Sequence, residues 1–476
     1  MFRFRWVFCQ LNELQRCFPP HLNRVLNELP ETLDETYERI LRGINKAQKE
    51  DARRLLQCLT IAARPLLVEE LAVLLAFDFE AMDERGIPTL KEDWRWNDKE
   101  QAVLSTCSSL IAIVRNGRLR VVQFSHFSVK EFITSPRLAQ SRGDVSRFYV
   151  DLNAAHTILA QACLGALLRL DDHARNSGSK EFPLAEYAAQ HWVEHAQFED
   201  VSSRGRNGMA DLFDSSKPHF AAWIRTHDID ERWGDFGSAS RDAIGSPLYY
   251  VAFCGFYDLE ERLIMKHPEQ VYVNGGLILS PLPAALSKRH FRVADLLWKH
   301  GAVVDVLDLD GCTPLHVTAE ILQSVDIMRW LLKHGANAST QTHNGRTPLH
   351  RAALNANLEA VQVLLEYNPD IGLRDTTGDT PLHDVLTEIG LSPEEKVVEI
   401  VRRLLEYGAD PNACRLRSGS TPLHQASSRE SLEVTRLLLS YGANINEKEG
   451  EGKTPVQVAS SDEMRKLRSE QGAVAL

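Results

Sequence analysis

A short unit of Ser or Thr, then Pro, then an aliphatic residue recurs through the C-terminal half of the chain. Its first residues are spaced by 34, 33, 34, 33, 41 and 33 positions: Ser246, Ser280, Thr313, Thr347, Thr380, Thr421 and Thr454. A fixed period of this length is typical of stacked repeats, in which each unit buries its apolar face only against its neighbours. The sequence therefore predicts an elongated helical array in this half.

Each unit contains the residues that begin a helix. The Ser or Thr hydroxyl can cap the first helix, and Pro suits the first helical position because its missing N–H is not needed there. A histidine follows the Leu in four of the units: His316, His350, His383 and His424. Because these histidines recur with the period, we expect them to hydrogen-bond with the capping threonines and not to bind metal.

The second helix of each unit carries a pair of leucines and ends at a residue that tolerates a left-handed backbone. That residue is Gly301, Gly335, Asn368, Gly408 or Gly442. Asp310-Gly311, Asn344-Gly345 and Ser418-Gly419 then favour tight hairpin turns between units. The pattern resembles the ankyrin repeat family over about 246–472. We expect about seven repeats within 241–476, forming a solenoid with short β-hairpins.

The ankyrin resemblance implies a protein partner on the concave face of the solenoid, contacted by the hairpin tips and the first helices. Eight polar tip residues are the candidates for that contact: Asp308, Gln341, His343, Arg374, Thr376, Arg415, Arg417 and Lys448. The alternative is that these residues simply face solvent. Extra residues around 389–393 lengthen one repeat, and we expect a specialised contact there.

The region 29–140 has the pattern of a winged-helix domain. Helices are expected over 33–44, 51–63 and from Val68, followed by strands at 110–114 and 119–124 that meet in a type I′ turn at Asn116-Gly117. Such a domain can bind DNA through basic residues of the wing. Acidic neighbours, and a region 68–79 without any basic residue, make a DNA-binding regulator the weaker alternative.

Four stretches of this half resemble fungal NACHT-type signal-transduction NTPases with ankyrin tails: residues 4–11, 29–41, 64–72 and 124–133. The last stretch is also similar to the end of the winged helix in animal NOD-like receptors. Where an NTPase domain is present, the resemblance implies that His126 contacts the β-phosphate of the bound nucleotide. The alternative is that His126 ties the strand to the next helix.

The sequence contains no P-loop pattern, and Glu447 stands where a P-loop ending in Gly452-Lys453-Thr454 would need its first glycine. The resemblance therefore implies the regulatory and sensor part of a NACHT-ankyrin signalling protein without its NTPase domain. Residues 1–28 are expected to form the helical segment that follows the missing NACHT domain.

Residues 141–240 are expected to be a helical linker, with helices at 154–168 and 184–195 and a loop at 176–179. The second helix contains His191, Glu194 and His195, which match the H-x-x-E-H pattern of inverted zinc peptidases. A zinc hydrolase is thus a third alternative. A five-residue pattern is weak, however, and packing of a helix rich in aromatic residues accounts for it equally well.

The composition agrees with a non-catalytic interaction protein. A formal charge of −11 and a pI near 5.9 disfavour general nucleic-acid binding. The eight cysteines are scattered without zinc-site spacing, which is typical of a reducing compartment. We therefore expect a mainly α, cytoplasmic protein that has no membrane span, cofactor, metal or small-molecule substrate and is not an enzyme.

Overall fold

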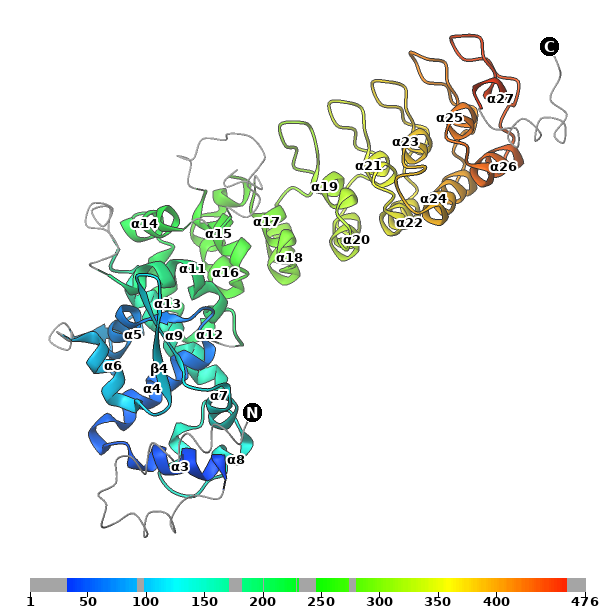
Figure 1. The fold of residues 1–476 in the computed structure, drawn as a ribbon. Coiled ribbons are helices and arrows are strands. Elements are labelled where there is room, and N and C mark those ends of the chain that lie inside the picture. Colours follow the sequence, from blue (N-terminus) through cyan, green and yellow to red (C-terminus); the bar gives the residue numbers. More distant parts are fainter. Residues whose placement is uncertain are drawn as a thin grey trace. The chain divides into compact units, whose positions relative to one another are not determined.

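The computed structural model describes residues 32–91, 98–170, 182–199, 201–227, 229–230, 245–273 and 280–459. The chain divides into two compact units, residues 1–265 and 266–476 (Figure 1). Both units are mainly helical, as predicted. The segments expected at 1–28 and 176–179 lie outside the described residues.

The winged-helix region of the first unit combines helices with two small antiparallel sheets. Strand order in the larger sheet is β1-β5-β4, and β2 pairs with β3. The elements are α3 (Leu33–Gly43), η2 (Lys46–Gln48), α4 (Lys49–Ile61), β1 (Leu66–Leu67), α5 (Val68–Leu75), β2 (Phe77–Met82), β3 (Pro88–Leu90), α6 (Lys99–Cys107), β4 (Ile111–Asn116), β5 (Leu119–Phe124), α7 (Phe127–Ile133) and α8 (Pro136–Ala139).

Two features of this region correct the sequence prediction. Among the described residues four helices, and not three, precede the wing, because α6 and the β2-β3 hairpin follow α5. The buried residues of α6 include Ala102, Thr106 and Cys107, which are too small or too polar to produce a clear apolar stripe. The helix was therefore missed.

The turn of the wing is the second correction. Asn116 pairs with Leu119, so the two central residues of the turn are Gly117 and Arg118 and not Asn116 and Gly117. Gly117 has a φ of 61°, whereas Arg118 is not in the left-handed region. A glycine at the first central position with an ordinary residue at the second is the pattern of a type II′ turn, not of the predicted type I′ turn.

Helices follow the winged helix to the end of the first unit. They are α9 (Leu152–Leu167), α11 (Leu184–Ala196), α12 (Val201–Arg204), α13 (Arg206–Leu212), α14 (Pro218–Thr226), α15 (Pro247–Cys254) and α16 (Tyr257–Lys266), with a short η4 (Ser146–Phe148) before them. The predicted helices at 154–168 and 184–195 are confirmed by α9 and α11. Helices α9 and α11 pack side by side.

An aromatic cluster joins these helices to the first repeat. Trp192 of α11 stacks on Phe256, at the start of the first repeat's second helix, with ring centroids 5.5 Å apart. Its other neighbour is Trp223 of α14, edge-on at 5.3 Å. The side-chain amide of Gln197 also donates to the carbonyl of Cys254 at 2.6 Å. The first repeat thus shares the core of the helical linker.

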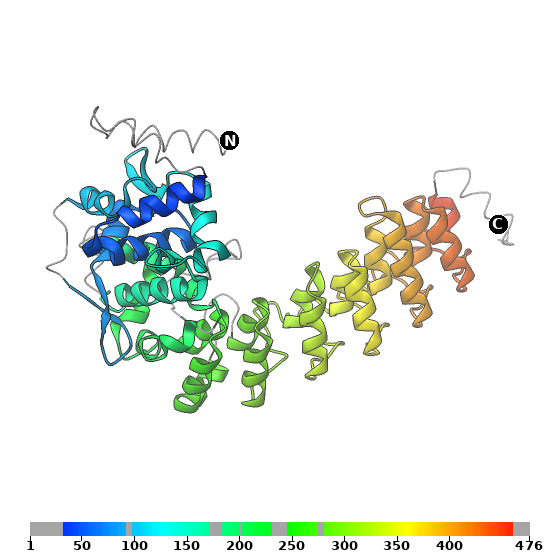
Figure 2. The same ribbon diagram turned by 90° about the horizontal axis from the view of Figure 1, so that it is seen from below.

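The second unit consists of helix pairs in two rows (Figures 1 and 2). The inner row is α17 (Pro281–Ser287), α19 (Pro314–Glu320), α21 (Pro348–Leu354), α23 (Pro381–Thr387), α25 (Pro422–Ser428) and α27 (Pro455–Val458). The outer row is α18 (Phe291–Lys299), α20 (Val325–Lys333), α22 (Leu358–Glu366), α24 (Glu394–Glu406) and α26 (Leu432–Ser440), with η6 (Pro268–Tyr272) before the first pair. Every inner helix begins at the predicted proline.

The left-handed backbone conformation predicted at the ends of the outer helices is confirmed. All four predicted glycines and Asn368 have positive φ, with Gly335 at 95° and Asn368 at 47°. The sequence did not indicate a second left-handed position, which lies between the inner and outer helices. Four repeats place a residue other than glycine there, namely Arg289, Gln323, Ala356 and Glu430.

Candidate interaction surface along the hairpin tips

Five hairpins of the second unit project on the same side of the array (Figure 1). Each is closed by two backbone hydrogen bonds, as in the second hairpin, where Thr342 donates to Arg346 at 2.9 Å and Gly345 donates to Thr342 at 2.8 Å. Gly345 has a φ of 76°, which the predicted turn requires. The hairpins are short and contain no assigned strand in the described part of the array.

Neighbouring hairpin tips are joined to one another through their backbones. His343 N–H donates to Asp310 at 3.1 Å, and Thr376 N–H donates to Asn344 at 3.0 Å. The series continues with Leu416 to Thr377 and Gly450 to Ser418. These bonds hold the tips in one continuous edge, which we call the tip edge (residues 308–312, 341–346, 374–379, 415–420 and 448–453). Its side chains are presented from a fixed backbone.

Six of the eight predicted contact residues are exposed on the tip edge. His343, Thr376, Arg417 and Lys448 present their side chains to solvent. Gln341 and Arg374 are also exposed, but each reaches the next hairpin. The Gln341 amide donates to the carbonyl of Arg374 at 3.1 Å, and the Arg374 guanidinium donates to the carbonyl of Cys414 at 2.7 Å.

The other two predicted residues are held inside their hairpins. The Asp308 carboxylate accepts from the backbone N–H of Asp310 at 2.9 Å and of Cys312 at 2.7 Å, so it fixes its own turn. Arg415 makes a two-pronged ion pair with Asp379 of the preceding hairpin, at 2.5 and 3.1 Å. The structure gives both side chains a role in shaping the tip edge.

Two exposed leucines belong to the tip edge and were not predicted. Leu309 is 93% exposed and Leu416 is 69% exposed. Each lies between two charged residues of a hairpin turn. The side chain of Leu416 lies over Gly378 of the preceding hairpin, where a Cβ would collide with it. A leucine within a predicted hairpin turn could have indicated this exposed apolar side chain from the sequence alone.

The histidines form the predicted caps at the base of the hairpins. Nδ1 of His350 accepts from the backbone N–H of Thr347 at 3.1 Å, and Nε2 donates to the carbonyl of Asp379 in the next repeat at 3.0 Å. His316 and His424 make the same two contacts. Burial lowers the pKa of His316 to about 4, so this ring is neutral at pH 7.

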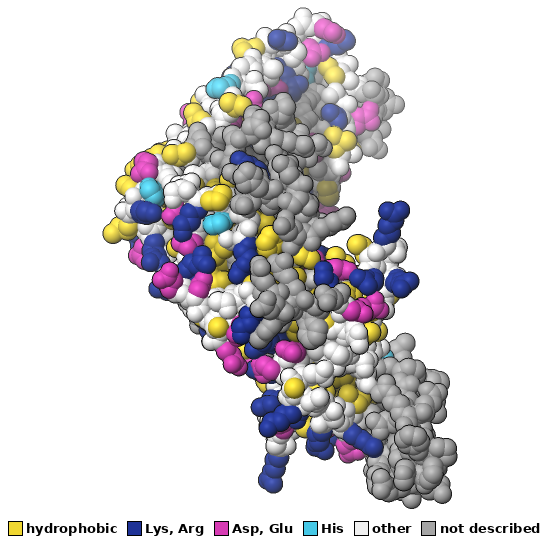
Figure 3. All heavy atoms as spheres, turned by 90° about the vertical axis from the view of Figure 1, so that its left-hand side faces the viewer, with side chains coloured by type: hydrophobic (Ala, Val, Ile, Leu, Met, Phe, Trp, Pro, Cys, Tyr) yellow, Lys and Arg dark blue, Asp and Glu magenta, His cyan; other side chains and the backbone are white. Residues whose placement is uncertain are grey.

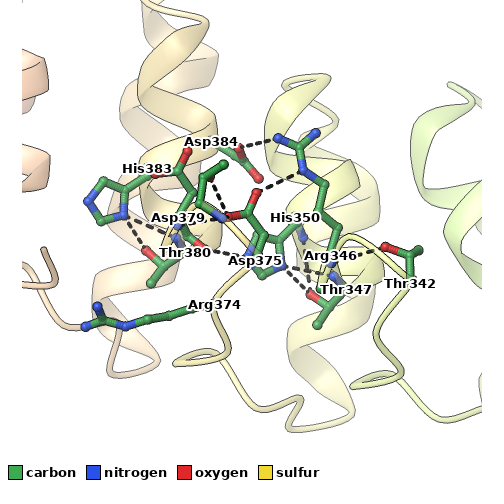
Figure 4. A network of polar contacts seen from close by, with 12 residues as sticks. Thr342, Arg346, Thr347, His350, Arg374, Asp375, Asp379, Thr380, His383 and Asp384 are labelled. Carbon is green, nitrogen blue, oxygen red and sulfur yellow. Dashed lines mark hydrogen bonds and ion pairs between the residues drawn. The ribbon is translucent and has the colours of Figure 1, made fainter. Parts of the chain in front are cut away.

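A charged network lies between the Thr347 and Thr380 repeats (Figure 4). Nε of Arg346 lies 3.2 Å from Asp375, and its Nη2 lies 3.6 Å from Asp384. Asp375 also accepts from the backbone N–H of Thr377 at 2.8 Å. Sequence reasoning missed this network, because its members come from two hairpins and one inner helix.

His126 lies between β5 and α7 in the winged helix. It is the N-cap of α7, and its Nδ1 accepts from the backbone N–H of Ser128 at 3.2 Å. The hydroxyl of Ser128 pairs with His126 Nδ1 at 2.6 Å and with the hydroxyl of Tyr37 in α3 at 2.8 Å. His126 thus caps α7, the helix that follows β5, and Ser128 links this cap to α3.

One of the three arginines of the wing is held in ion pairs, and the other two are exposed. Arg120 pairs with Glu69 of α5 at 2.5 Å and with Glu100 of α6 at 2.9 Å, whereas Arg115 and Arg118 are exposed. The helix directly before the wing is α6, so the predicted recognition region 68–79 is instead α5 and the start of β2. On the face drawn in Figure 3, basic side chains are interspersed with acidic ones.

The H-x-x-E-H pattern is part of a packed core. Both ring nitrogens of His195 are engaged, Nε2 with the Tyr187 hydroxyl at 2.9 Å and Nδ1 with Nδ1 of His156 at 3.0 Å. Burial lowers the pKa of His195 to about 3. Nδ1 of His191 lies 3.5 Å from Glu194. No group of three or more His, Cys, Asp or Glu side chains suited to a metal occurs among the described residues.

Two further expectations concern the whole chain. None of the helices in the described part combines the length and apolar character that a membrane crossing needs. The cysteines of the described ranges are free, and all but Cys414 are buried.

Comparison with protein families finds two matches. The description "Ankyrin repeats (3 copies)" matches residues 248–342, 323–413 and 391–468. The description "GPI inositol-deacylase, winged helix domain" matches residues 37–144.

Similar proteins share parts of this organisation. "Azaphilone pigments biosynthesis cluster protein L" of Monascus ruber is 33% identical over 309 residues, covering 60% of this chain and 62% of that protein. Human "Ankyrin repeat and SOCS box protein 16" is 33% identical over 216 residues, covering 45% of this chain and 47% of that protein. The chain thus spans less than two thirds of either relative.

Among solved structures, the ankyrin repeat domain of Bcl-3 is 29% identical, with a TM-score of 0.43, and the match covers 47% of this chain and 98% of that one. The two family matches cover the winged-helix region and the helix pairs described above. The chain therefore carries a winged helix of the GPI inositol-deacylase type followed by an array of ankyrin repeats, which is a protein–protein interaction module.

Proposed function

We propose that this chain is the non-catalytic regulatory and sensor part of a NACHT-ankyrin signalling protein, and that it binds a protein partner along its tip edge. The observation that carries this proposal is the tip edge itself. Its backbone is cross-linked from hairpin to hairpin, while the side chains at its most exposed positions differ from repeat to repeat.

A cross-linked edge favours binding because little backbone freedom remains to be lost when a partner docks. The exposed leucines at 309 and 416 supply apolar area, and burial of one leucine side chain contributes about 1.5–3 kcal/mol. His343, Thr376, Arg417 and Lys448 add polar and charged groups that differ along the edge. Such a mixture suits an extended protein segment that contacts several repeats at once.

The NACHT part of the proposal concerns the first unit. It is supported by the winged helix, by the four sequence stretches named above, and by the Monascus relative, whose alignment covers more of the chain than the repeat array does. In this proposal His126, at the start of α7, contacts the phosphate of a nucleotide held by an NTPase domain. The order of regions is winged helix at 29–140, helical linker at 141–240 and repeats at 241–476, and the setting is the cytoplasm.

Site-specific photocrosslinking tests the interaction surface. A photoreactive amino acid is placed at Thr376 or Arg417 of the tip edge, or at Glu359 or Arg436 on the outer helices as matched exposed controls. In an extract of the source organism, the two tip positions should crosslink the same protein and the two control positions should not. Equal crosslinking from all four positions would contradict the proposed surface.

A titration with labelled duplex DNA tests the DNA-binding alternative. The proposal expects no saturable, salt-sensitive binding, because the chain carries a formal charge of −11 and Arg120 of the wing is already paired with two carboxylates. Tight binding that is lost in the double variant Arg115→Ala, Arg118→Ala would instead assign the function to the wing.

A further inference from the structure

Equivalent turn positions in the first four hairpins of the tip edge follow the order apolar, polar, polar, apolar. These positions hold Leu309, His343, Thr376 and Leu416, and the last three donate their backbone N–H to the hairpin before them. Leu309 and Leu416 are 93% and 69% exposed, and His343 and Thr376 also face solvent. The order of side chains is therefore the same from either end of these four hairpins.

The charges beside the two leucines are opposite in sign. Leu309 has an aspartate on each side, whereas Leu416 has an arginine on each side. Asp310 and Arg417 belong to these pairs of neighbours. Both are exposed, and neither forms an ion pair with another described residue. The first hairpin is thus acidic and the fourth hairpin is basic.

Most other charges of the tip edge are already compensated. Arg346 of the second hairpin pairs with Asp375 of the third, and Arg415 of the fourth hairpin pairs with Asp379 of the third. The fifth hairpin holds two lysines and two glutamates. Arg374 donates to a backbone carbonyl at the start of the fourth hairpin, so its charge adds to the basic side. The row of four hairpins therefore has one acidic end and one basic end.

We propose that the partner of the tip edge is a second copy of this chain, bound with the two edges antiparallel about a two-fold axis. The axis passes between the second and third hairpins, so the first hairpin of each copy meets the fourth hairpin of the other. Leu309 then packs on Leu416 of the second copy, and Asp310 faces Arg417 of the second copy. Both contacts occur twice, because a two-fold interface uses the same surface on each copy. This inference rests on the proposed function, since it identifies the partner of that same surface.

The charges select the antiparallel arrangement. If the two edges ran in the same direction, acidic hairpins would meet each other and so would basic hairpins, and like charges in contact repel. In the antiparallel arrangement each exposed charge meets an opposite charge, and each exposed leucine meets a leucine. The backbone bonds between tips hold each row in place before the copies meet. Because four turns make a small interface, we expect a dimer that dissociates on dilution.

Sedimentation equilibrium of the purified full chain, over a wide range of concentration, tests the proposal. The wild type should pass from monomer to dimer as its concentration rises. Arg417→Glu places an acidic group opposite Asp310 of the second copy, and Asp310→Lys places a basic group opposite Arg417. Each variant alone should dimerise on the order of tenfold more weakly, because repulsion arises at both ends of the interface.

Mixing the two variants should restore the dimer. In the mixed pair the new glutamate meets the new lysine, while the unchanged Asp310 of one copy meets the unchanged Arg417 of the other. The mixture and the double variant should therefore associate about as tightly as the wild type. The matched control is Arg436→Glu on the outer helix α26, which should leave the dimer unchanged.

A wild type that stays monomeric at every concentration would overturn the dimer. The proposed function would still stand if Thr376 and Arg417 then crosslinked a different protein in the extract. Weaker dimers of the single variants that mixing does not restore would overturn the antiparallel pairing. Dimers that neither single variant weakens would place the contact elsewhere on the chain. Failure of the proposed function has a separate outcome, which is equal crosslinking from the tip edge and from the outer helices.

Discussion

The capping histidines connect the stability of single repeats to pH. Each ring is buried and accepts a backbone N–H at Nδ1, so a proton added there would break the cap. Burial lowers the pKa of His316 to about 4, below the ordinary value of 6.5. A lowered histidine pKa gives stability that is complete above pH 6.5 and is lost as pH falls toward 4. The array should therefore weaken in mild acid.

The last repeat of the chain suggests a variant that tests this. Gln457 occupies the histidine position there, and its side-chain oxygen accepts from the backbone N–H of Thr454 at 2.8 Å. We expect His316→Gln to keep the cap but to reduce the loss of unfolding free energy between pH 7 and pH 5. Urea unfolding at both values measures this. An unchanged pH dependence would show that His316 is not one of the groups that titrate.

Two histidines that differ in one hydrogen bond provide a matched pair. His350 bonds to the next repeat through Nε2 and His383 does not, although both cap a threonine. His350→Ala should therefore lower the free energy of unfolding by about 1 kcal/mol more than His383→Ala, the net value of one buried hydrogen bond. Urea midpoints of the two variants give the difference. Equal losses would mean that the bridges contribute nothing to stacking.

At the scale of elements, the connection between inner and outer helices stores backbone strain. The left-handed position is glycine at Gly255 and Gly390, but Glu430 occupies it with a φ of 58°. For a residue with a Cβ, this conformation costs about 1–2 kcal/mol. Glycine avoids that cost, but its greater freedom in the unfolded chain offsets part of the gain in stability. Since the Glu430 side chain is exposed, it has little packing to lose.

We expect Glu430→Gly to stabilise the array by about 0.5–1 kcal/mol. The matched control is Arg436→Gly, an exposed position within α26, where glycine should destabilise by about 1 kcal/mol. Thermal unfolding of both variants should move in opposite directions. Destabilisation by both would show that the connection is not strained in solution.

Some helices and turns could be predicted from the sequence and others could not. Helix starts in the array were predicted correctly because Thr, Pro and the following residues act locally. The wing turn was misplaced by one residue because pairing of β4 with β5, not the Asn-Gly dipeptide alone, sets the register. Helix α6 was missed because its buried residues are small, and its place is fixed by packing against α4 and α5.

For the whole molecule, periodicity predicted the array and the positions of its hairpins, but not the contacts between repeats. The pairing of Arg415 with Asp379 and the burial of Asp384 depend on residues from adjacent repeats. In a single unit these side chains look like ordinary exposed charges. The departure of one spacing from 33 to 41 residues marked the unusual repeat, yet the sequence could not show how its side chains contact the neighbouring repeats.

The division into two units gives the last prediction. Trp192 is 1% exposed within the aromatic cluster that joins the linker helices to the first repeat, and Leu364 is fully buried in the array. Trp192→Ala should cost about 3–5 kcal/mol and Leu364→Ala about 2–5 kcal/mol, because each leaves a cavity. Hydrogen exchange should show faster opening of α11, α14 and α15 in the first variant, and of α20, α22 and α24 in the second. If either substitution loosened both sets of helices equally, the two units would unfold as one.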